Sequence, residues 1–252
     1  MKQFDTLKEL METKEELAKE LVPYVDEDAH IPMLKHPLVF QVPYTPQFNA
    51  VSNRALKQKQ AMLAEAIVER NISRIVWLHE RPYRLDALLE HYEHCLSGSA
   101  GGVNGGQRKA QELRRLADMV VQVWTDSENI WQNYDAWVDL LEQCGNTALR
   151  RATSKEDQEV YRALPKTVKL YRGGRIDWED MMDSRPPLSW SLDKTKAEWF
   201  ARRFMAHRHE DGNLITAEID KKDIYFYTDA RNEQEVVVLS DGLRIGDITK
   251  VT

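Results

Sequence analysis

Apolar residues in the first 163 residues mostly recur every three or four positions, the spacing of helices that bury one face. In the N-terminal stretch they alternate with charged residues and fall at Phe4, Leu7, Leu10, Met11, Leu17 and Leu21. The same spacing predicts helices over 52–69 and over 75–95, and Pro82 either starts or kinks the latter. Five prolines within 22–48 exclude a continuous helix there.

A run of small residues, 97–106, interrupts the helical pattern. Its glycines and serines are typical of a flexible connection, so we place a domain boundary there. The prediction is a helical region over 1–96, a hinge over 97–106 and a second domain over 107–252.

The second domain is predicted to open with helices. Helical spacing extends from 107 to 143 and is interrupted near 125–127, where helix-capping residues cluster, which predicts two packed helices. Ser154 and Asp157 have the spacing of a capping pair, so a short helix is expected to start there and to end near Pro165.

After residue 163 the pattern changes to short runs of β-branched and aromatic residues separated by turn-forming residues, as in strands. One helix is expected from Thr195 to about His207. The predicted strands cover 168–172, 188–192, 214–219, 224–228, 235–239 and 244–251. The chain is therefore predicted to be α+β, with helices first and a mostly antiparallel sheet last.

Composition narrows the classes of partner. The net charge of −6 provides no general attraction for phosphate backbones, which favours a protein or small molecule over nucleic acid. Two cysteines in 252 residues indicate a reducing compartment and no disulfide framework. The N-terminus lacks a signal-peptide pattern, and no apolar run approaches the roughly 20 residues that a bilayer requires. We therefore expect a soluble, cytoplasmic protein without a membrane partner.

Metal and phosphate-loop motifs are not apparent. His91, His94 and Cys95 share a helical segment, but no second cluster with ligand spacing accompanies them. Gly106 is followed by Gln107 and not by the Lys-Ser/Thr of a phosphate-binding loop. We expect no metal cofactor.

Polar residues at strand ends suggest the chemistry. Arg172 precedes Gly173, and an arginine at a strand end can fork onto a pyrophosphate that a glycine lets approach. Glu233 and Glu235 precede a valine-rich run, and strand alternation would direct both to one side. A carboxylate at the edge of a core is costly unless it is paired or functional.

Four segments, which follow one another along the chain, resemble the arginine–serine–glutamate mono-ADP-ribosyltransferases, the cholera- and iota-toxin-like family. The third of them, Phe200 and Arg203, is similar to a Phe-x-x-Arg pair in the actin-modifying binary toxins of that family. Arg172-Gly173 is similar to the strand-borne arginine and glycine of that family, and Glu233-Gln234-Glu235 to its Glu-x-Glu motif. Ser189-Trp190-Ser191 resembles its serine–threonine–serine strand, with tryptophan in place of threonine. On a strand, Trp190 would point away from the two serines. The resemblance covers about residues 168–240.

The resemblance implies an antiparallel β-sandwich whose cleft, walled also by the helices from about 107 onward, binds NAD as a substrate. It implies NAD contacts from Arg172, Gly173, Ser189 and Ser191, and from the Phe-x-x-Arg pair Phe200 and Arg203.

The resemblance also assigns the reaction. Glu235 would be the catalytic carboxylate facing the nicotinamide ribose, with Ser189 supporting it, and Glu233 would handle an acceptor guanidinium. Tyr225–Arg231 would be the acceptor-recognition turn, with Tyr227 as its aromatic residue.

Three functions stay open. The leading one is transfer of ADP-ribose from NAD to an arginine of a target protein, with release of nicotinamide, as in a toxin or phage effector. The second is the same chemistry on a nucleic acid base or on water, the latter being NAD glycohydrolysis. The third is an inactive relative that serves as a binding module. Residues 1–96 match no family and would bind a target, an inhibitor, an antitoxin or an immunity partner.

Overall fold

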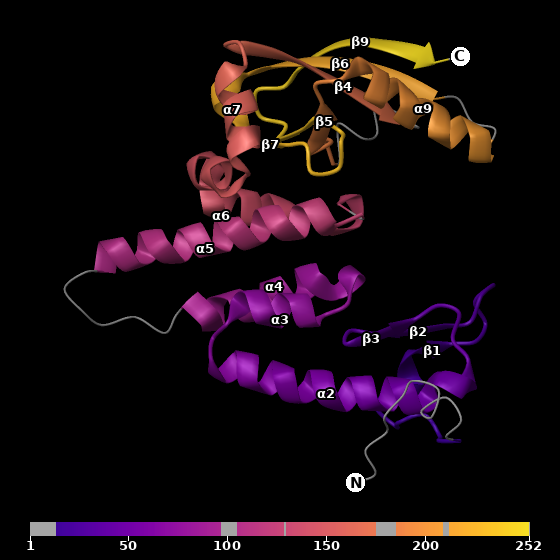
Figure 1. Cartoon of the computed structure of the whole chain (residues 1–252). Coiled ribbons are helices and arrows are strands. Elements are labelled where there is room, and N and C mark those ends of the chain that lie inside the picture. Colours follow the sequence, from indigo (N-terminus) through magenta and orange to yellow (C-terminus); the bar gives the residue numbers. More distant parts are fainter. Residues whose placement is uncertain (1–13, 97–104, 129, 175–184, 209–211, 252) are drawn as a thin grey trace. The chain divides into compact units, whose positions relative to one another are not determined.

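The computed structural model describes residues 14–96, 105–128, 130–174, 185–208 and 212–251 (Figure 1). The chain divides into two compact units, Met1–Gly105 and Gly106–Thr252. The division falls in the glycine-rich run, of which residues 97–104 lie outside the described residues.

The helices of the N-terminal unit are α2 (Asn49–Val68), α3 (Ile72–Leu78) and α4 (Arg84–Leu96). The helix predicted over 75–95 is divided in two at Pro82, the residue that was expected to start or kink it. Pro82 lies in a one-turn 3-10 helix, Arg81–Tyr83, that separates α3 from α4. Proline has no backbone N–H to continue an α-helix, which explains the break.

A small antiparallel sheet in the N-terminal unit was not predicted. Its strands, in spatial order, are β1 (Val25–Asp26), β2 (Met33–His36) and β3 (Val39–Gln41). They are too short, and too closely spaced by prolines, to produce a clear alternation of apolar and polar residues.

The helix predicted at the N-terminus is absent from its described part. Residues 14–18 have no regular structure and 19–21 form a turn, while 1–13 lie outside the described residues. Leu21 is fully buried in a cluster with Leu34 and Leu56. Packing against β2 and α2 therefore determines the conformation of this segment.

The helices of the C-terminal unit follow the prediction, except that the second one continues beyond residue 143 to Ala152. The expected break near 125–127 is confirmed, and Ser154 Oγ caps the short helix by accepting from the Asp157 N–H at 3.0 Å. Gly145, with a φ of 69°, kinks one helix. The helices are α5 (Gly105–Asp126), α6 (Tyr134–Ala152), α7 (Lys155–Ala163) and α9 (Lys194–Arg208).

Six antiparallel strands of the C-terminal unit form one sheet in the order β7-β8-β5-β4-β6-β9. All six predicted strands are present: β4 (Thr167–Gly174), β5 (Ser189–Ser191), β6 (Gly212–Asp220), β7 (Ile224–Thr228), β8 (Glu235–Val238) and β9 (Arg244–Val251). The α+β class is thus confirmed. In place of the expected sandwich, the described strands of this unit form a single hydrogen-bonded sheet, in which the pair Tyr171–Ser191 joins β4 to β5.

Aromatic residues connect the helices of the C-terminal unit to its sheet. Trp124 of α5 packs edge-on against Trp137 of α6, with ring centroids 5.0 Å apart, and against Phe226 of β7 at 5.9 Å. All three side chains are fully buried. These contacts fix the C-terminal end of α5 close to β7.

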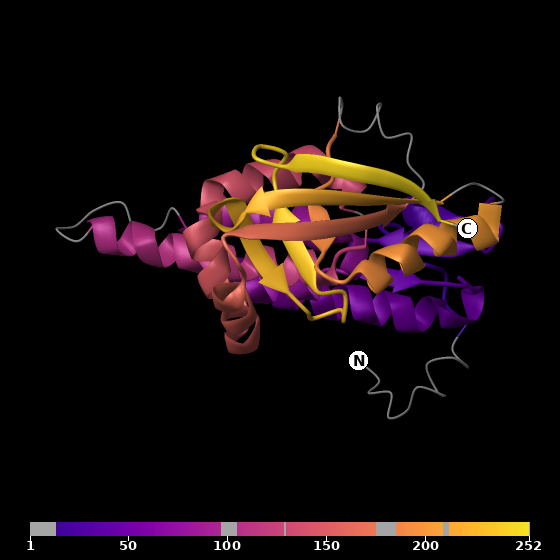
Figure 2. The same cartoon turned by 90° about the horizontal axis from the view of Figure 1, so that it is seen from above.

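Helix α9 lies against the sheet, beside the strands that carry two glycines (Figure 2). A Cβ added at Gly173 of β4 would lie 1.6 Å from the Ala197 carbonyl oxygen of α9. One added at Gly212 of β6 would lie 2.4 Å from the Ala201 carbonyl oxygen. Both positions therefore require glycine for the close approach of helix and sheet.

Candidate active site

Three neighbouring strands bring Arg172, Ser189 and Glu235 together. In the sheet, β5 lies between β4 and β8, and Ser191 pairs with both Tyr171 and Glu235. Ser189 Oγ donates to Glu235 Oε1 at 2.5 Å, and Arg172 Nη1 donates to the Ser189 carbonyl oxygen. Residues 63 positions apart in the sequence thus form one polar cluster because antiparallel pairing fixes their register.

The two charges of this cluster differ in exposure, since Glu235 is buried and Arg172 is partly buried. The Glu235 side chain is 2% exposed. Burial lowers the pKa of Arg172 to about 10, although the nearby charge of Glu235 acts to raise it. Arg172 therefore remains a cation at neutral pH, and it contributes a positive field beside the buried carboxylate.

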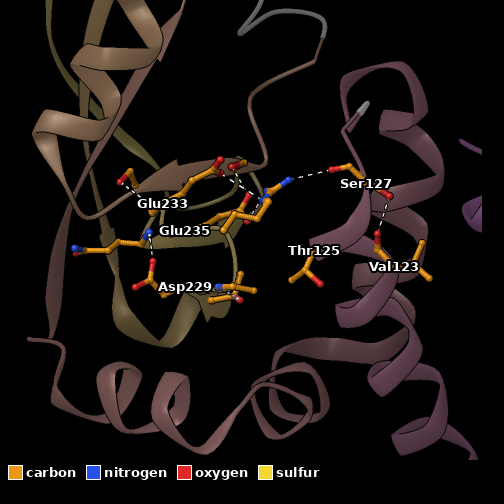
Figure 3. Close-up of polar contacts among 12 residues, drawn as sticks. Val123, Thr125, Ser127, Asp229, Glu233 and Glu235 are labelled. Carbon is orange, nitrogen blue, oxygen red and sulfur yellow. Dashed lines mark hydrogen bonds and ion pairs between the residues drawn. The ribbon is translucent and has the colours of Figure 1, made fainter. Parts of the chain in front are cut away.

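A turn formed by Asp229–Gln234 connects β7 to β8 and carries Glu233. Within it, Arg231 Nη2 donates to Glu235 Oε2 at 2.8 Å, and Arg231 Nε lies 3.5 Å from Glu233 Oε2. Arg231 Nη1 donates to the Ser127 carbonyl oxygen at 3.0 Å. In Figure 3 a dashed line connects the side of the site that holds Glu233 and Glu235 with Ser127, the residue directly after α5.

The two glutamates share a partner, but strand alternation is not the reason. Strand β8 begins only at Glu235, and Gln234 has a left-handed φ of 46°. Asn232 is also left-handed, with a φ of 55°. The tight turn, and not a pleated strand, therefore brings Glu233 and Glu235 to the same guanidinium.

The serine strand has its polar and apolar residues on opposite sides, as predicted. Trp190 is 2% exposed in the sheet core, and its Nε1 donates to the Pro187 carbonyl oxygen at 3.0 Å. Ser191 Oγ donates to the Glu233 carbonyl oxygen at 2.7 Å and accepts from the Asp193 N–H at 3.0 Å. Ser191 thereby connects β5 both to the turn that carries Glu233 and to the segment before α9.

Tyr227 does not lie on the expected acceptor surface. Its side chain is 4% exposed and belongs to the core of the sheet, and burial raises its pKa to about 12. Within the expected recognition segment, 225–228 belong to β7, so the turn proper begins at Asp229. A buried tyrosine contributes packing and cannot reach a macromolecular acceptor, so this expectation is corrected.

Phe200 and Arg203 lie on α9 beside Trp199. The rings of Phe200 and Trp199 are 5.0 Å apart, and the Arg203 guanidinium carbon lies 5.5 Å from the Trp199 ring centroid. The charges of Lys196 and Arg203 both lower the pKa of Glu233. Helix α9 therefore contributes positive charge on the Glu233 side of the site.

Sequence reasoning did not single out Arg231. It included this residue only as the end of a recognition segment, because the left-handed turn that brings Arg231 to both glutamates leaves no signal in the local sequence. The contribution of Ser127 was not detectable from the sequence, because its backbone carbonyl approaches Arg231 only in the folded unit.

In comparisons with known proteins, no family model matches the chain, and no curated protein or solved structure matches it significantly. Among the described residues, no group of three or more histidine, cysteine or acidic side chains could hold a metal ion. None of the described helices is long and apolar enough to cross a membrane.

Proposed function

We propose that the C-terminal unit is a mono-ADP-ribosyltransferase that transfers ADP-ribose from NAD to an arginine of a target protein. The observation that carries the proposal is the buried Glu235 carboxylate, hydrogen-bonded to Ser189 Oγ at 2.5 Å beside the cation of Arg172. Burying a carboxylate costs free energy. A reaction whose transition state develops positive charge explains why it is present, because the carboxylate stabilises that charge.

In this reaction the bond between ribose C1′ and the nicotinamide nitrogen breaks, and its electron pair leaves with nicotinamide. Glu235 accepts the ribose 2′-hydroxyl and stabilises the oxocarbenium character at C1′. A carboxylate has about four acceptor positions, and Ser189 and Arg231 use two of those on Glu235, so capacity for the hydroxyl remains.

The remaining residues support the donor and the acceptor. Arg172 and Arg203 supply positive charge suited to the NAD pyrophosphate, and Phe200 supplies an aromatic surface for the nicotinamide. Glu233, half-buried, takes a proton from the acceptor guanidinium as its nitrogen bonds to C1′. Burial raises the pKa of Glu233, which suits a group that must accept a proton.

The test is incubation of the protein with labelled NAD, a cell lysate and, separately, agmatine. The wild type should release nicotinamide and label protein and agmatine, and Glu235→Gln should reduce both activities about 10²–10³-fold. Glu218→Gln, an exposed glutamate on β6 of the same sheet, is the matched control and should behave as wild type. A Glu235→Gln variant as active as that control would refute the assignment.

A second candidate is hydrolysis of NAD, with water as the acceptor. The observation that favours it is Arg231, whose own guanidinium already contacts Glu233, the carboxylate that an acceptor arginine would use. In the same assay, this function predicts free ADP-ribose as the main labelled product. Label in the nucleic acid fraction would indicate a nucleic acid acceptor.

A further inference from the structure

The turn that carries Glu233 is held in one conformation by its own hydrogen bonds. The N–H groups of Asn232 and Gln234 donate to Asp229, to its carbonyl oxygen and its Oδ1 respectively, each at 2.9 Å. Asp229 N–H in turn donates to Asp157 Oδ1 of α7 at 3.0 Å. The backbone of the turn is therefore fixed without any contribution from the Arg231 side chain.

The Arg231 side chain adds a different set of contacts. Its three nitrogens face Glu235, Glu233 and the Ser127 carbonyl oxygen, at 2.8, 3.5 and 3.0 Å. Ser127 directly follows α5, and its own Oγ donates to the Val123 carbonyl oxygen at 2.7 Å. Arg231 thus joins both acidic side chains to the end of a helix that the Trp124 and Phe226 rings pack against the sheet.

Other charged groups also surround the two carboxylates. Arg172 of β4 acts on Glu235, Lys196 and Arg203 of α9 act on Glu233, and Glu128 acts on Arg231. Burial raises the pKa of Glu233, the Arg231 charge lowers it and the Glu235 charge raises it again. Burial and mutual repulsion both disfavour the charged forms of these two acidic groups. The positive charge of Arg231 therefore offsets part of both effects.

We propose that Arg231 is a positioning residue for the proposed reaction: it holds Glu233 and Glu235 in a fixed mutual geometry and anchors both to the end of α5. The inference rests on the proposed transferase activity. Stability alone does not account for the residue, because an ion pair with one buried member, here Glu235, adds little net stability compared with apolar side chains of similar size. A guanidinium does, however, impose a directional fork that an apolar side chain lacks.

The test compares Arg231→Met and Arg231→Lys with wild type, using nicotinamide release from NAD. Arg231→Met should lower kcat about 10²-fold while KM changes less than about threefold, since the displaced carboxylates affect the reacting state and not ground-state binding. Arg231→Lys, which keeps a charge but not the fork, should recover part of kcat. Arg244→Gln, which removes an exposed pair with Asp220, is the control for losing an arginine and should match wild type.

A second measurement does not need NAD. In a titration followed by ¹³C NMR of the glutamate side chains, Arg231→Met should raise the pKa of Glu233 above its wild-type value, and Arg231→Lys should raise it less. Circular dichroism establishes that each variant is folded.

Two results would overturn the inference. One is an unchanged kcat together with an unchanged Glu233 titration in folded Arg231→Met. The other is a lower KM with kcat retained, which would mean that Arg231 hinders NAD binding and does not position the carboxylates. Wild-type protein that releases no nicotinamide would refute the proposed function instead, and the titration would still decide whether Arg231 controls Glu233.

Discussion

The two units of the chain bury polar side chains of different kinds. In the N-terminal unit Asn49, 7% exposed, accepts from Tyr44 Oη at 3.0 Å and donates to the Glu15 carbonyl oxygen at 3.1 Å. In the C-terminal unit the most deeply buried polar or charged side chain among the described residues is Glu235, 2% exposed and held by Ser189 and Arg231. A satisfied amide costs little to bury, whereas each ion costs several kcal/mol.

The comparison indicates where chemistry is to be expected. Asn49 joins the start of α2 to the segment before it, a role that stability explains fully. Glu235 draws groups from two neighbouring strands and from the turn before β8 around one charge, and stability does not explain that cost. Mutations around the buried charge are therefore expected to change activity, whereas mutation of the buried amide is expected to change stability.

The largest expected effect tests the division of labour between the two glutamates. Glu233→Gln should lower transfer to arginine or agmatine by about 10²-fold or more, because proton removal from the acceptor is lost. Slow nicotinamide release should persist, since Glu235 is intact and water can replace the acceptor. Both products can be followed in one reaction. Transfer at the wild-type rate would make Glu233 a structural residue and would favour a nucleic acid acceptor.

Gly173→Ala should destabilise the C-terminal unit by about 1–3 kcal/mol or more, because the added methyl group meets the backbone of α9. Thermal unfolding followed by calorimetry measures the change. Gly145→Ala is a useful comparison, since a Cβ there meets nothing within 4 Å and only the positive φ of 69° opposes it. Equal stability of Gly173→Ala and wild type would mean that α9 does not pack this closely.

Asn49→Ala should cost about 1–3 kcal/mol in the N-terminal unit, since buried partners lose their hydrogen bonds. It should leave the NAD chemistry unchanged at temperatures where that unit is folded. Calorimetry and the nicotinamide assay on the same preparation distinguish the two outcomes. A loss of NAD turnover without a loss of stability would contradict the contrast between the units.

The smallest effect is expected at Gln234, an exposed residue with a φ of 46°. Gln234→Gly should raise the unfolding free energy by at most about 1 kcal/mol. Glycine adopts this conformation without strain, which stabilises the folded state, while its greater entropy in the unfolded chain offsets part of the gain. A clear loss of stability in denaturant titration would show that the glutamine side chain, and not its backbone, stabilises the turn.

Local patterns predicted the C-terminal unit well. The strand 224–228 and the terminal strand 244–251 were predicted with the observed bounds, and Ser154 caps α7 as its spacing with Asp157 indicated. These features depend on alternation and capping, which act between residues close in sequence. The N-terminal unit was predicted less well, since β1–β3 are short and Leu21 is packed by residues distant in the chain.

In the candidate site, too, some features follow from the local sequence and others depend on long-range contacts. By itself the sequence determined the serine strand, the arginine before Gly173 and the direction of Trp190 away from the two serines, because residue type and alternation suffice for these. It also singled out the acidic pair, but by residue type alone. Only the tertiary structure decided that Tyr227 is core, that Gly173 accommodates α9 and that Arg231 joins Glu233 and Glu235 to Ser127. These contacts depend on strand pairing, a left-handed turn and the end of a helix more than 100 residues away in the sequence, and long-range geometry of this kind leaves no local pattern.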